Sequence, residues 1–219
     1  MDRLHNRILD DDRGLTLVEL LVALALAAMV SLALVSTFTS YSRTRTVQEN
    51  VIAMQQNLRA ALYLMGRDLR MAGYRGPNPT SAPAAGFVTA NATTFSFTVV
   101  DDTTNTLTTI SYQYFDSDGD GTNDALRRSD GTMTNELVAE NIDGVEFYYT
   151  LSDGTQSTTP TPLGNIRSVE VAVLARTNRN DPDFSNATTY SKPSGTFWGP
   201  YNDGRRRRLG ESVVLFRNM

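Results

Sequence analysis

Residues 15–35 form the feature that most limits what this chain can fold into. They are apolar except for Thr16, Glu19 and Ser31. As a helix, a run of this length spans about 32 Å, which is enough to cross a bilayer core of about 30 Å. A carboxylate within such a helix costs at least about 2.5 kcal/mol and implies a partner for its charge. The run therefore predicts a membrane helix in which Glu19 has a specific role.

Two simple kinds of apolar segment explain this region incompletely. A secretory signal peptide has a basic start, a short apolar core and a small-residue cleavage site. Here residues 1–14 carry four Asp against three Arg, and the apolar run is long and continues into a polar helix. A plain membrane anchor explains the run but leaves Glu19 without a partner. A third kind of segment has to account for the carboxylate.

The stretch GLTLVE, residues 14–19, followed by the apolar run resembles the cleavage and methylation signature of type IV prepilins. The resemblance implies that a membrane peptidase cuts between Gly14 and Leu15 and that the new N terminus is methylated. A free α-amine is largely cationic at neutral pH. Glu19, about one helical turn further on, can then meet the amine of its own chain or of the next subunit. Such prepilins usually have Phe where this chain has Leu15, and major pilins often carry a Pro in the membrane helix. The absence of that Pro favours a minor component.

The helix is expected to continue beyond the membrane as an amphipathic helix. Apolar residues recur at spacings of three and four, which predicts one stripe facing a core: Val47, Val51, Met54, Leu58, Leu62, Met65 and Leu69. The helix should end near Ala72, with Gly73 in a left-handed conformation and Gly76 and Pro77 beyond it. From Leu15 it would be about 87 Å long if straight. We therefore divide the chain into a leader (1–14), a transmembrane and assembly helix (15–38), its amphipathic continuation (39–72) and a β-rich head (73–219).

Pro and Gly, which interrupt helices and form turns, are concentrated in the head, as is typical of a β structure. All eight Pro and 12 of the 15 Gly lie at or after Gly76, whereas residues 15–65 contain neither. Runs rich in β-branched and aromatic residues predict strands at 86–89, 94–100, 106–115, 136–142, 145–151, 166–177 and 212–217, with ALRRS (125–129) also strand-like. The predicted fold is α+β and type IV pilin-like, with the long N-terminal helix packed on a mostly antiparallel sheet.

One loop of the head has part of a calcium-binding pattern. In DSDGDGTND, Asp116, Asp118, Asp120 and Asp124 occupy the first, third, fifth and ninth positions, and Thr122 could offer its carbonyl at the seventh. The twelfth position, normally a bidentate Glu, is Arg127, and strands flank the loop where helices would be expected. The alternative is a solvated turn rich in Asp and Gly. Calcium is the only cofactor that the sequence suggests.

Composition removes most catalytic chemistry. The chain has no Cys, its only His is His5 in the leader, and its net charge is -4. Histidine and thiolate chemistry are therefore unavailable to the head, and no carboxylate pair can be chosen for catalysis. The run RRRR, residues 205–208, lies among acidic residues, which favours a strand edge or loop whose arginines pair with carboxylates over a nucleic-acid site. We expect neither enzymatic activity nor a nucleic-acid partner.

Two further stretches resemble PilW-type minor pilins, and the first of them also resembles, less closely, the J-type pseudopilins of type II secretion. They are GRDLRMAGYRG (66–76), at the helix end, and RRRRLGESVVLFRN (205–218), at the closing strand. The resemblance implies a minor pilin with its leader in the cytoplasm and its head in the periplasm, which primes assembly of a type IV pilus and stays near the pilus tip. Its partners would be the prepilin peptidase, other minor pilins, the major pilin and the inner-membrane assembly platform. The alternatives are a type II secretion pseudopilin and a membrane-anchored adhesin or calcium-binding module that does not polymerise.

Overall fold

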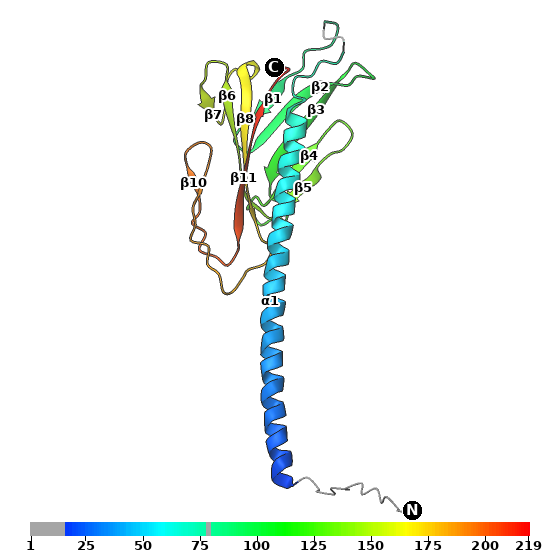
Figure 1. Cartoon of the computed structure of the whole chain (residues 1–219). Coiled ribbons are helices and arrows are strands. Elements are labelled where there is room, and N and C mark those ends of the chain that lie inside the picture. The colour runs from blue at the N-terminus through cyan, green and yellow to red at the C-terminus, as the bar shows by residue number, and fades with distance from the viewer. Residues whose placement is uncertain (1–15, 78–79) are drawn as a thin grey trace, which may run out of the picture. The chain divides into compact units, whose positions relative to one another are not determined.

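The computed structural model describes residues 16–77 and 80–219. It divides into two compact units, one ending at Thr46 and the other comprising Val47–Met219. The first unit holds the apolar part of the helix α1, which spans Leu17–Leu69. The second unit holds the amphipathic part of α1 together with all the strands (Figure 1). These elements confirm the predicted α+β, pilin-like fold.

Within the second unit, α1 packs its apolar stripe into the core, as predicted. Met54, Leu58, Met65 and Leu69 are buried, and Ala61, between them on the same face, is completely covered. This burial is the main source of the helix's stability in the head, because an isolated helix is held only weakly by its own hydrogen bonds.

The helix ends at Leu69, three residues before the predicted Ala72. The amide of Met71 donates to the carbonyl of Asp68 at 2.9 Å, and the amide of Ala72 donates to that of Leu69 at 3.1 Å. These bonds span three residues, so the last turn is tightened into a non-α turn. Gly73 has φ +76°, which confirms its predicted left-handed conformation. Its amide bonds to the carbonyl of Thr98 at 3.3 Å, and the chain thereby turns toward the first sheet.

The strands form two main sheets where the sequence predicted one. The five-stranded sheet is a simple meander in the order β1-β2-β3-β4-β5, with every pair antiparallel. Its strands are β1 (Phe87–Ala90), β2 (Thr94–Val100), β3 (Leu107–Phe115), β4 (Ala125–Ser129) and β5 (Glu136–Glu140). A predicted strand at 136–142 is divided here, because Asn141 has a positive φ of 57° and the next residue begins the second sheet.

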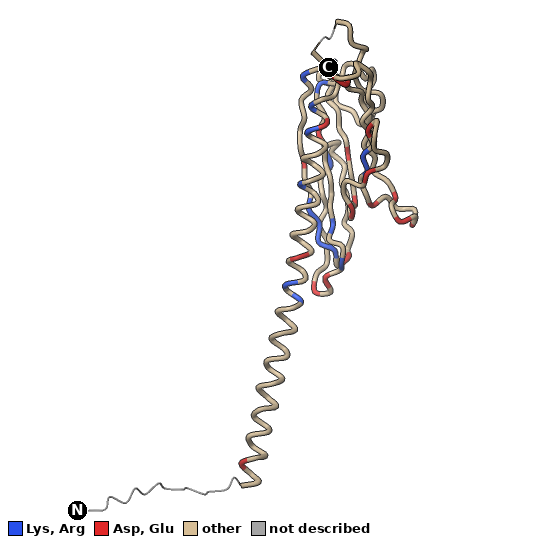
Figure 2. The backbone as a smooth tube through the Cα atoms, turned by 90° about the vertical axis from the view of Figure 1, so that its right-hand side faces the viewer, with Lys and Arg blue, Asp and Glu red and all other residues tan. Residues whose placement is uncertain are grey.

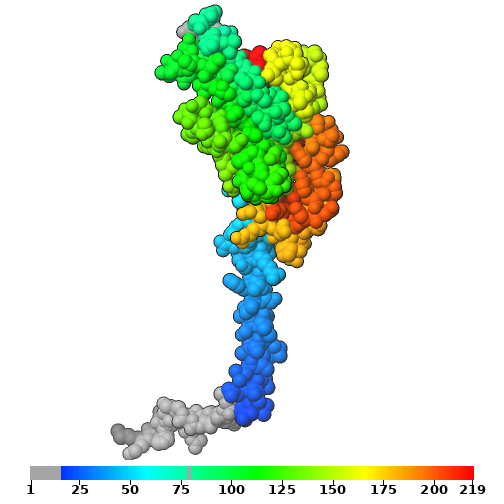
Figure 3. Space-filling model, turned by 180° about the vertical axis from the view of Figure 1, so that it is seen from behind, coloured from blue at the N-terminus to red at the C-terminus, as the bar shows by residue number. Residues whose placement is uncertain are grey.

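The second sheet has the order β11-β8-β6-β7 and is also antiparallel. Its strands are β6 (Ile142–Leu151), β7 (Gln156–Ser157), β8 (Ile166–Arg176) and β11 (Arg207–Leu215), with a short 3-10 turn at Leu163–Asn165 before β8. Between β8 and β11 the chain forms a two-stranded ribbon of β9 (Tyr190–Ser191) and β10 (Phe197–Trp198). The segment that carries this ribbon is orange in Figure 3 and forms part of the outer surface of the unit. The closing strand was predicted at 212–217 but starts at Arg207, where it pairs with Arg176.

Aromatic side chains fill the space between the two sheets. Phe95 stacks on Tyr112 with ring centroids 5.1 Å apart and meets Phe147 of the second sheet edge to face at 4.7 Å. Phe87 contacts Phe216 at 5.1 Å, which ties the end of the chain to β1. Such geometries are favourable for aromatic rings and add to the free energy of burying them. The two sheets and the helix therefore share one hydrophobic core.

A glycine in the closing strand lets the helix approach the second sheet. A Cβ at Gly210 would lie 2.8 Å from the Cδ1 of Leu62 and 3.0 Å from both Cδ atoms of Leu58. Gly66, the glycine within α1, does not make this approach, because a Cβ there would meet only the Cγ2 of Val214, at an ordinary 4.0 Å. The close contact is therefore made through a glycine of the strand and leucines of the helix.

Candidate functional site

The start of α1 is the first candidate site. Gly14 and Leu15, the predicted cleavage residues, lie outside the described residues. Glu19 is described, and its Oε2 accepts hydrogen bonds from the amide of Thr16 at 2.9 Å and from the Oγ1 of Thr16 at 2.8 Å. The amide of Glu19 in turn donates to the Oγ1 of Thr16 at 3.3 Å. This reciprocal arrangement is a capping box, in which residue and backbone satisfy each other at a helix start.

The sequence analysis did not anticipate Thr16 as a partner of Glu19. A signal for it was present, because Thr-x-x-Glu directly before an apolar run is the sequence pattern of a capping box. The capping box does not test the predicted pairing of Glu19 with an N-terminal amine. That pairing stays a prediction, because the amine would exist only after cleavage.

The surface of α1 that follows Glu19 is apolar and exposed. Between Thr16 and Ser42, Glu19 is the only charged residue, as the colouring of Figure 2 shows. Large apolar side chains from Leu17 to Tyr41 are more than half exposed. An 18-residue window of α1 has a mean hydropathy of 2.6, and none of it is buried. Length and composition suit a single membrane span, and the same surface could pack against other helices.

The acidic loop between β3 and β4 is the second candidate site. Carboxylate oxygens of Asp116, Asp118 and Asp120 can be chosen within 4.8 Å of one another. Both oxygens of Asp116 accept backbone bonds at 2.7 Å, one from the amide of Gly119 and one from that of Gly121. These bonds lower the pKa of Asp116, with that from Gly121 contributing most. The loop thus has the internal hydrogen bonds of an Asp-Gly turn and also clusters three carboxylates.

Asp124 and Thr122 differ from those three residues. Asp124 Oδ1 accepts bonds from the amide and the hydroxyl of Ser117, at 3.0 and 2.7 Å, so it closes the base of the loop. The amide of Thr122 donates to Asp120 Oδ1 at 2.7 Å. Arg127, at the twelfth position of the pattern, lies on β4 and donates to Gln113 at 2.6 Å. Calcium binding therefore stays a prediction that concerns Asp116, Asp118 and Asp120 above all.

Two arginines of the 205–208 run pair with carboxylates, as predicted. Arg206 meets Asp181 at 2.7 Å. Arg207 is almost completely buried and contacts both Asp143 and Asp203, the latter at 2.6 Å. Its guanidinium also lies 3.7 Å from the ring centroid of Tyr201. The burial of Arg207 was not predicted, because its partners are distant in sequence or lie in a loop.

A second buried ionic cluster joins the end of α1 to the first sheet. Asp68 Oδ2 accepts bonds from Arg128 Nε at 2.7 Å and from the hydroxyl of Tyr112 at 2.8 Å. Arg128 also donates to Asp130 at 2.6 Å. Burial raises the pKa of the Tyr112 hydroxyl, and the charge of Asp68 adds to the effect. Asp68, although it lies in a charged stretch at the helix end, is therefore a buried connection between the helix and the first sheet.

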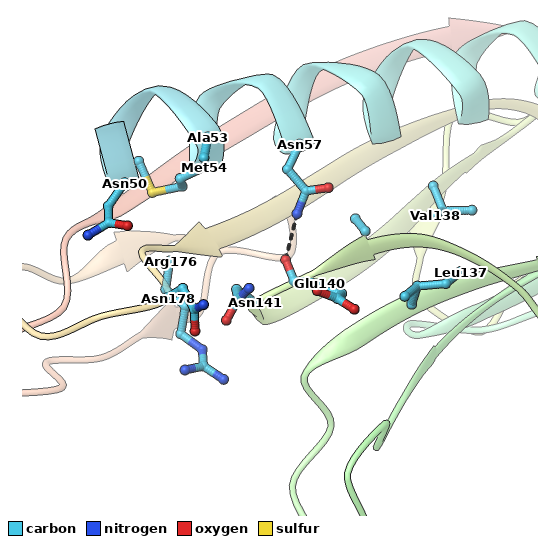
Figure 4. A pocket seen from close by; sticks show the side chains of 11 residues that line it. Asn50, Ala53, Met54, Asn57, Leu137, Val138, Glu140, Asn141, Arg176 and Asn178 are labelled. Atoms are coloured by element: carbon cyan, nitrogen blue, oxygen red, sulfur yellow. Dashed lines mark hydrogen bonds between the residues drawn. The ribbon is translucent and has the colours of Figure 1, made fainter. Parts of the chain in front are cut away.

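An open pocket of about 420 Å³ lies where α1 faces the ends of β5 and β8 (Figure 4). Asn57 of α1 lines one side of the pocket, and its Nδ2 donates to the carbonyl of Glu140 at 2.7 Å. Arg176 lines another side and forms an ion pair with Asp143 at 2.8 Å. The lining holds one carboxylate, that of Glu140, and no nucleophile. The pocket therefore does not present a catalytic arrangement.

The fold and the helix start together define the class of protein. Residues 10–35 match the model of the prokaryotic N-terminal methylation motif, in agreement with a prepilin-like N terminus. The head, from residue 96 to 218, matches the family described as type IV pilus-assembly protein W. A comparison with curated proteins found no match.

Because the second match covers more than half of the chain, the chain belongs to the type IV pilus-assembly protein W family. It is a type IV minor-pilin-like protein. Members of this family are structural components of pilus assembly. The prepilin motif implies processing by a peptidase.

Proposed function

We propose that this protein is a minor pilin that is cut after Gly14, anchored in the inner membrane by the apolar part of α1, and then incorporated into a type IV pilus. Its head lies in the periplasm before assembly. It primes pilus assembly with other minor pilins at the inner-membrane platform and remains near the tip. The observation that carries the proposal is the position of Glu19, the single charge in the apolar and exposed part of α1 (residues 17–42), in a chain of a pilus-assembly family.

The physical basis of incorporation is the match between this charge and an amine. Moving a helix from lipid into a bundle of helices gains little hydrophobic energy, because the surroundings are apolar in both cases. A carboxylate that meets a cationic amine in the bundle gains a strong charge-assisted hydrogen bond. Incorporation is therefore favoured in the register that brings Glu19 to the N terminus of a neighbouring subunit.

The family description favours a pilus over a type II secretion system, since its printed name is that of a pilus-assembly protein. The two systems share the same requirements at the helix start. Deleting the gene in its host and observing pili by electron microscopy separates the two. Loss of surface pili with unchanged protein secretion is the result expected of a minor pilin.

The first test is mass analysis of the N terminus of the membrane-extracted protein. The expected product begins with N-methylated Leu15, and a mature chain that keeps residues 1–14 would overturn the proposal.

Gly14→Val should leave the leader attached, because the added side chain blocks approach to the peptide bond. Glu19→Ala should be cut normally yet be depleted from sheared pili. Normal incorporation of Glu19→Ala would refute the charge-matching argument.

A further inference from the structure

The pocket beside α1 is built from one face of the helix and the edge of a strand. Its helical side consists of four residues at positions i, i+3, i+4 and i+7, which share one face of a helix: Asn50, Ala53, Met54 and Asn57. Its other side includes the consecutive residues 137–140 of β5. Successive side chains of a strand point to opposite faces, so consecutive residues line a pocket together only where the strand presents its edge to it. The pocket is therefore a groove along the edge of β5.

Among residues 16–77 and 80–219, no strand pairs with this edge of β5. The strand lies at the end of the order β1-β2-β3-β4-β5, and it pairs with β4 on its other side. The carbonyl of Glu140 accepts the Nδ2 of Asn57 at 2.7 Å, so this carbonyl is directed into the groove. The amide of Glu140 is directed there too, because the N–H and C=O of one strand residue lie on the same edge. The edge therefore offers a backbone donor and a backbone acceptor to an added strand.

Amide side chains line the groove opposite this edge and at its end. They include Asn50 of α1, Asn141 directly after β5, and Asn178 shortly after β8. In the part of the chain that the structure describes, the side chains of these three residues make no hydrogen bond. A carboxamide carries both donors and an acceptor, as a peptide group does. These side chains can therefore bond the backbone of an added strand on the edge that faces away from β5.

One end of the groove favours an anion. Arg176 lines this end and contacts Asp143 through its Nε, at 2.8 Å. The Nη1 and Nη2 atoms of Arg176 make no hydrogen bond to any described residue and, unlike Nε, are not buried. Glu140, the one carboxylate among the described residues of the lining, lies nearer to Leu137, at the other end (Figure 4). Two parallel N–H groups of a guanidinium match the two oxygens of a carboxylate, so Arg176 can bind one.

We propose that this groove is a docking site for a partner protein, which inserts an extended acidic segment beside β5. The segment adds a strand to the edge of β5, and one of its amides replaces Asn57 as the donor to the carbonyl of Glu140. Its Asp or Glu side chain bonds Nη1 and Nη2 of Arg176, and an apolar side chain rests on Leu137, which is 48% exposed. The site lies within the unit Val47–Met219 and goes beyond the assembly role proposed for α1.

Two observations favour a peptide over an acidic sugar as the occupant. Sugar rings usually stack on aromatic side chains, and none of the described residues that line the groove is aromatic. A free strand edge, in contrast, is recognised by extended peptides, in which main-chain hydrogen bonds supply affinity and side-chain pockets supply specificity. The volume of about 420 Å³ also lies in the range of binding pockets.

The first test measures the binding of synthetic peptides to the full chain in detergent micelles by fluorescence anisotropy. The probe is dye-labelled Asp-Val-Thr-Val-Asp with an amidated C terminus, which has the length of β5 and an Asp at each end to serve either strand direction. The control peptide has Asn in place of both Asp. We expect the acidic peptide to bind about tenfold more tightly, as for one bond to a charged group. Equal affinities, no binding of either peptide at about 1 mM, or binding of glucuronic acid without the peptide would each overturn the proposal.

Variants locate the bound peptide in the groove. Ala53→Trp fills the groove from an exposed position of α1 and should weaken binding at least about tenfold. Ala60→Trp, at an exposed position of α1 outside the lining, is the matched control and should change nothing. Arg176→Lys keeps a charge beside Asp143 but loses the fork, so the preference for the acidic peptide should fall to about twofold or less. Circular dichroism shows whether each variant is folded, and equal affinities for Ala53→Trp and Ala60→Trp would refute the site.

Amide hydrogen exchange separates an added strand from a peptide held by side chains alone. By NMR on the full chain in micelles, the amide of Glu140 should exchange at least about tenfold more slowly when the acidic peptide is bound. Unchanged exchange of this amide with the peptide bound would show that no strand is added, and the proposal would fall. None of these measurements depends on cleavage or pilus assembly, so their outcome is separate from that of the proposed function.

Discussion

Replacing Asp68 by Ala should destabilise the head strongly, although Asp68 lies in the charged stretch at the end of α1, between Arg67 and Arg70. The side chain of Asp68 is 7% exposed, and that of its partner Arg128 is 11% exposed. The substitution removes the acceptor of Arg128 Nε and of the Tyr112 hydroxyl, which is completely buried. Breaking a buried ion pair by deleting one partner typically costs 3–5 kcal/mol, since the other charge remains in a poorly solvated place.

The structure places the expected cost at the lower end of that range. Arg128 keeps a second carboxylate, Asp130, at 2.6 Å, so its charge is not left alone. We therefore expect Asp68→Ala to lower the free energy of unfolding by about 3 kcal/mol. Asp68→Asn keeps an acceptor oxygen but loses the charge, and should cost about 1–2 kcal/mol.

Urea unfolding of residues 47–219, followed by circular dichroism, measures these differences. Arg67→Ala is the matched control, because Arg67 also contacts Asp68 but its side chain is 57% exposed. It should change the free energy of unfolding by at most about 0.5 kcal/mol. Adding Arg128→Met to Asp68→Ala should recover part of the loss, since no charge is then left unpaired. A cost below about 1 kcal/mol for Asp68→Ala would refute the reasoning.

Three further predictions concern the head. Gly144→Ala would place a Cβ 2.5 Å from the ring of Trp198, the only Trp of the chain. The β9–β10 ribbon should therefore shift, which should move the tryptophan emission to longer wavelength and lower the free energy of unfolding by about 1–3 kcal/mol. Gly164→Ala, whose Cβ would have no neighbour within 4 Å, should change neither the tryptophan emission nor the free energy of unfolding. The pKa of Asp130 is lowered to about 2, first by the amide of Met133 and then by Arg128. An unfolded Asp takes up its proton near pH 3.9. The unfolded state therefore binds more protons as the pH falls from about 4 to 2, and stability falls with it. Acid titration of Asp130→Asn should show a shallower decline, and an unchanged slope would contradict the assignment. Calcium should raise the melting temperature of the head slightly and lose that effect when Asp116 and Asp118 are replaced by Asn, whereas an unchanged melting temperature in the natural head would rule out the site.

Local patterns in the sequence determined the helix and most strands. The stripe from Met54 to Leu69 repeats every three or four residues, and its burial follows from that period alone. The left-handed turn at Gly73 was readable for a similar reason, because a residue without Cβ is favoured there. The capping box of Thr16 and Glu19 is also local, and its Thr-x-x-Glu pattern could have been recognised before the structure was known.

The tertiary structure alone decided which distant residues meet. Asp68 finds Arg128 across 60 positions of sequence, and Arg207 finds Asp143 across 64. A charged residue has the same local signal whether it is solvated or buried in a pair, so periodicity cannot distinguish the two. The division into two sheets is likewise a matter of packing, since a strand's sequence states which faces are apolar but not which strand lies beside it. The sequence thus determined the anchor, the charge at its start and the helical stripe. Only the fold determined how the end of the helix is fastened to the head.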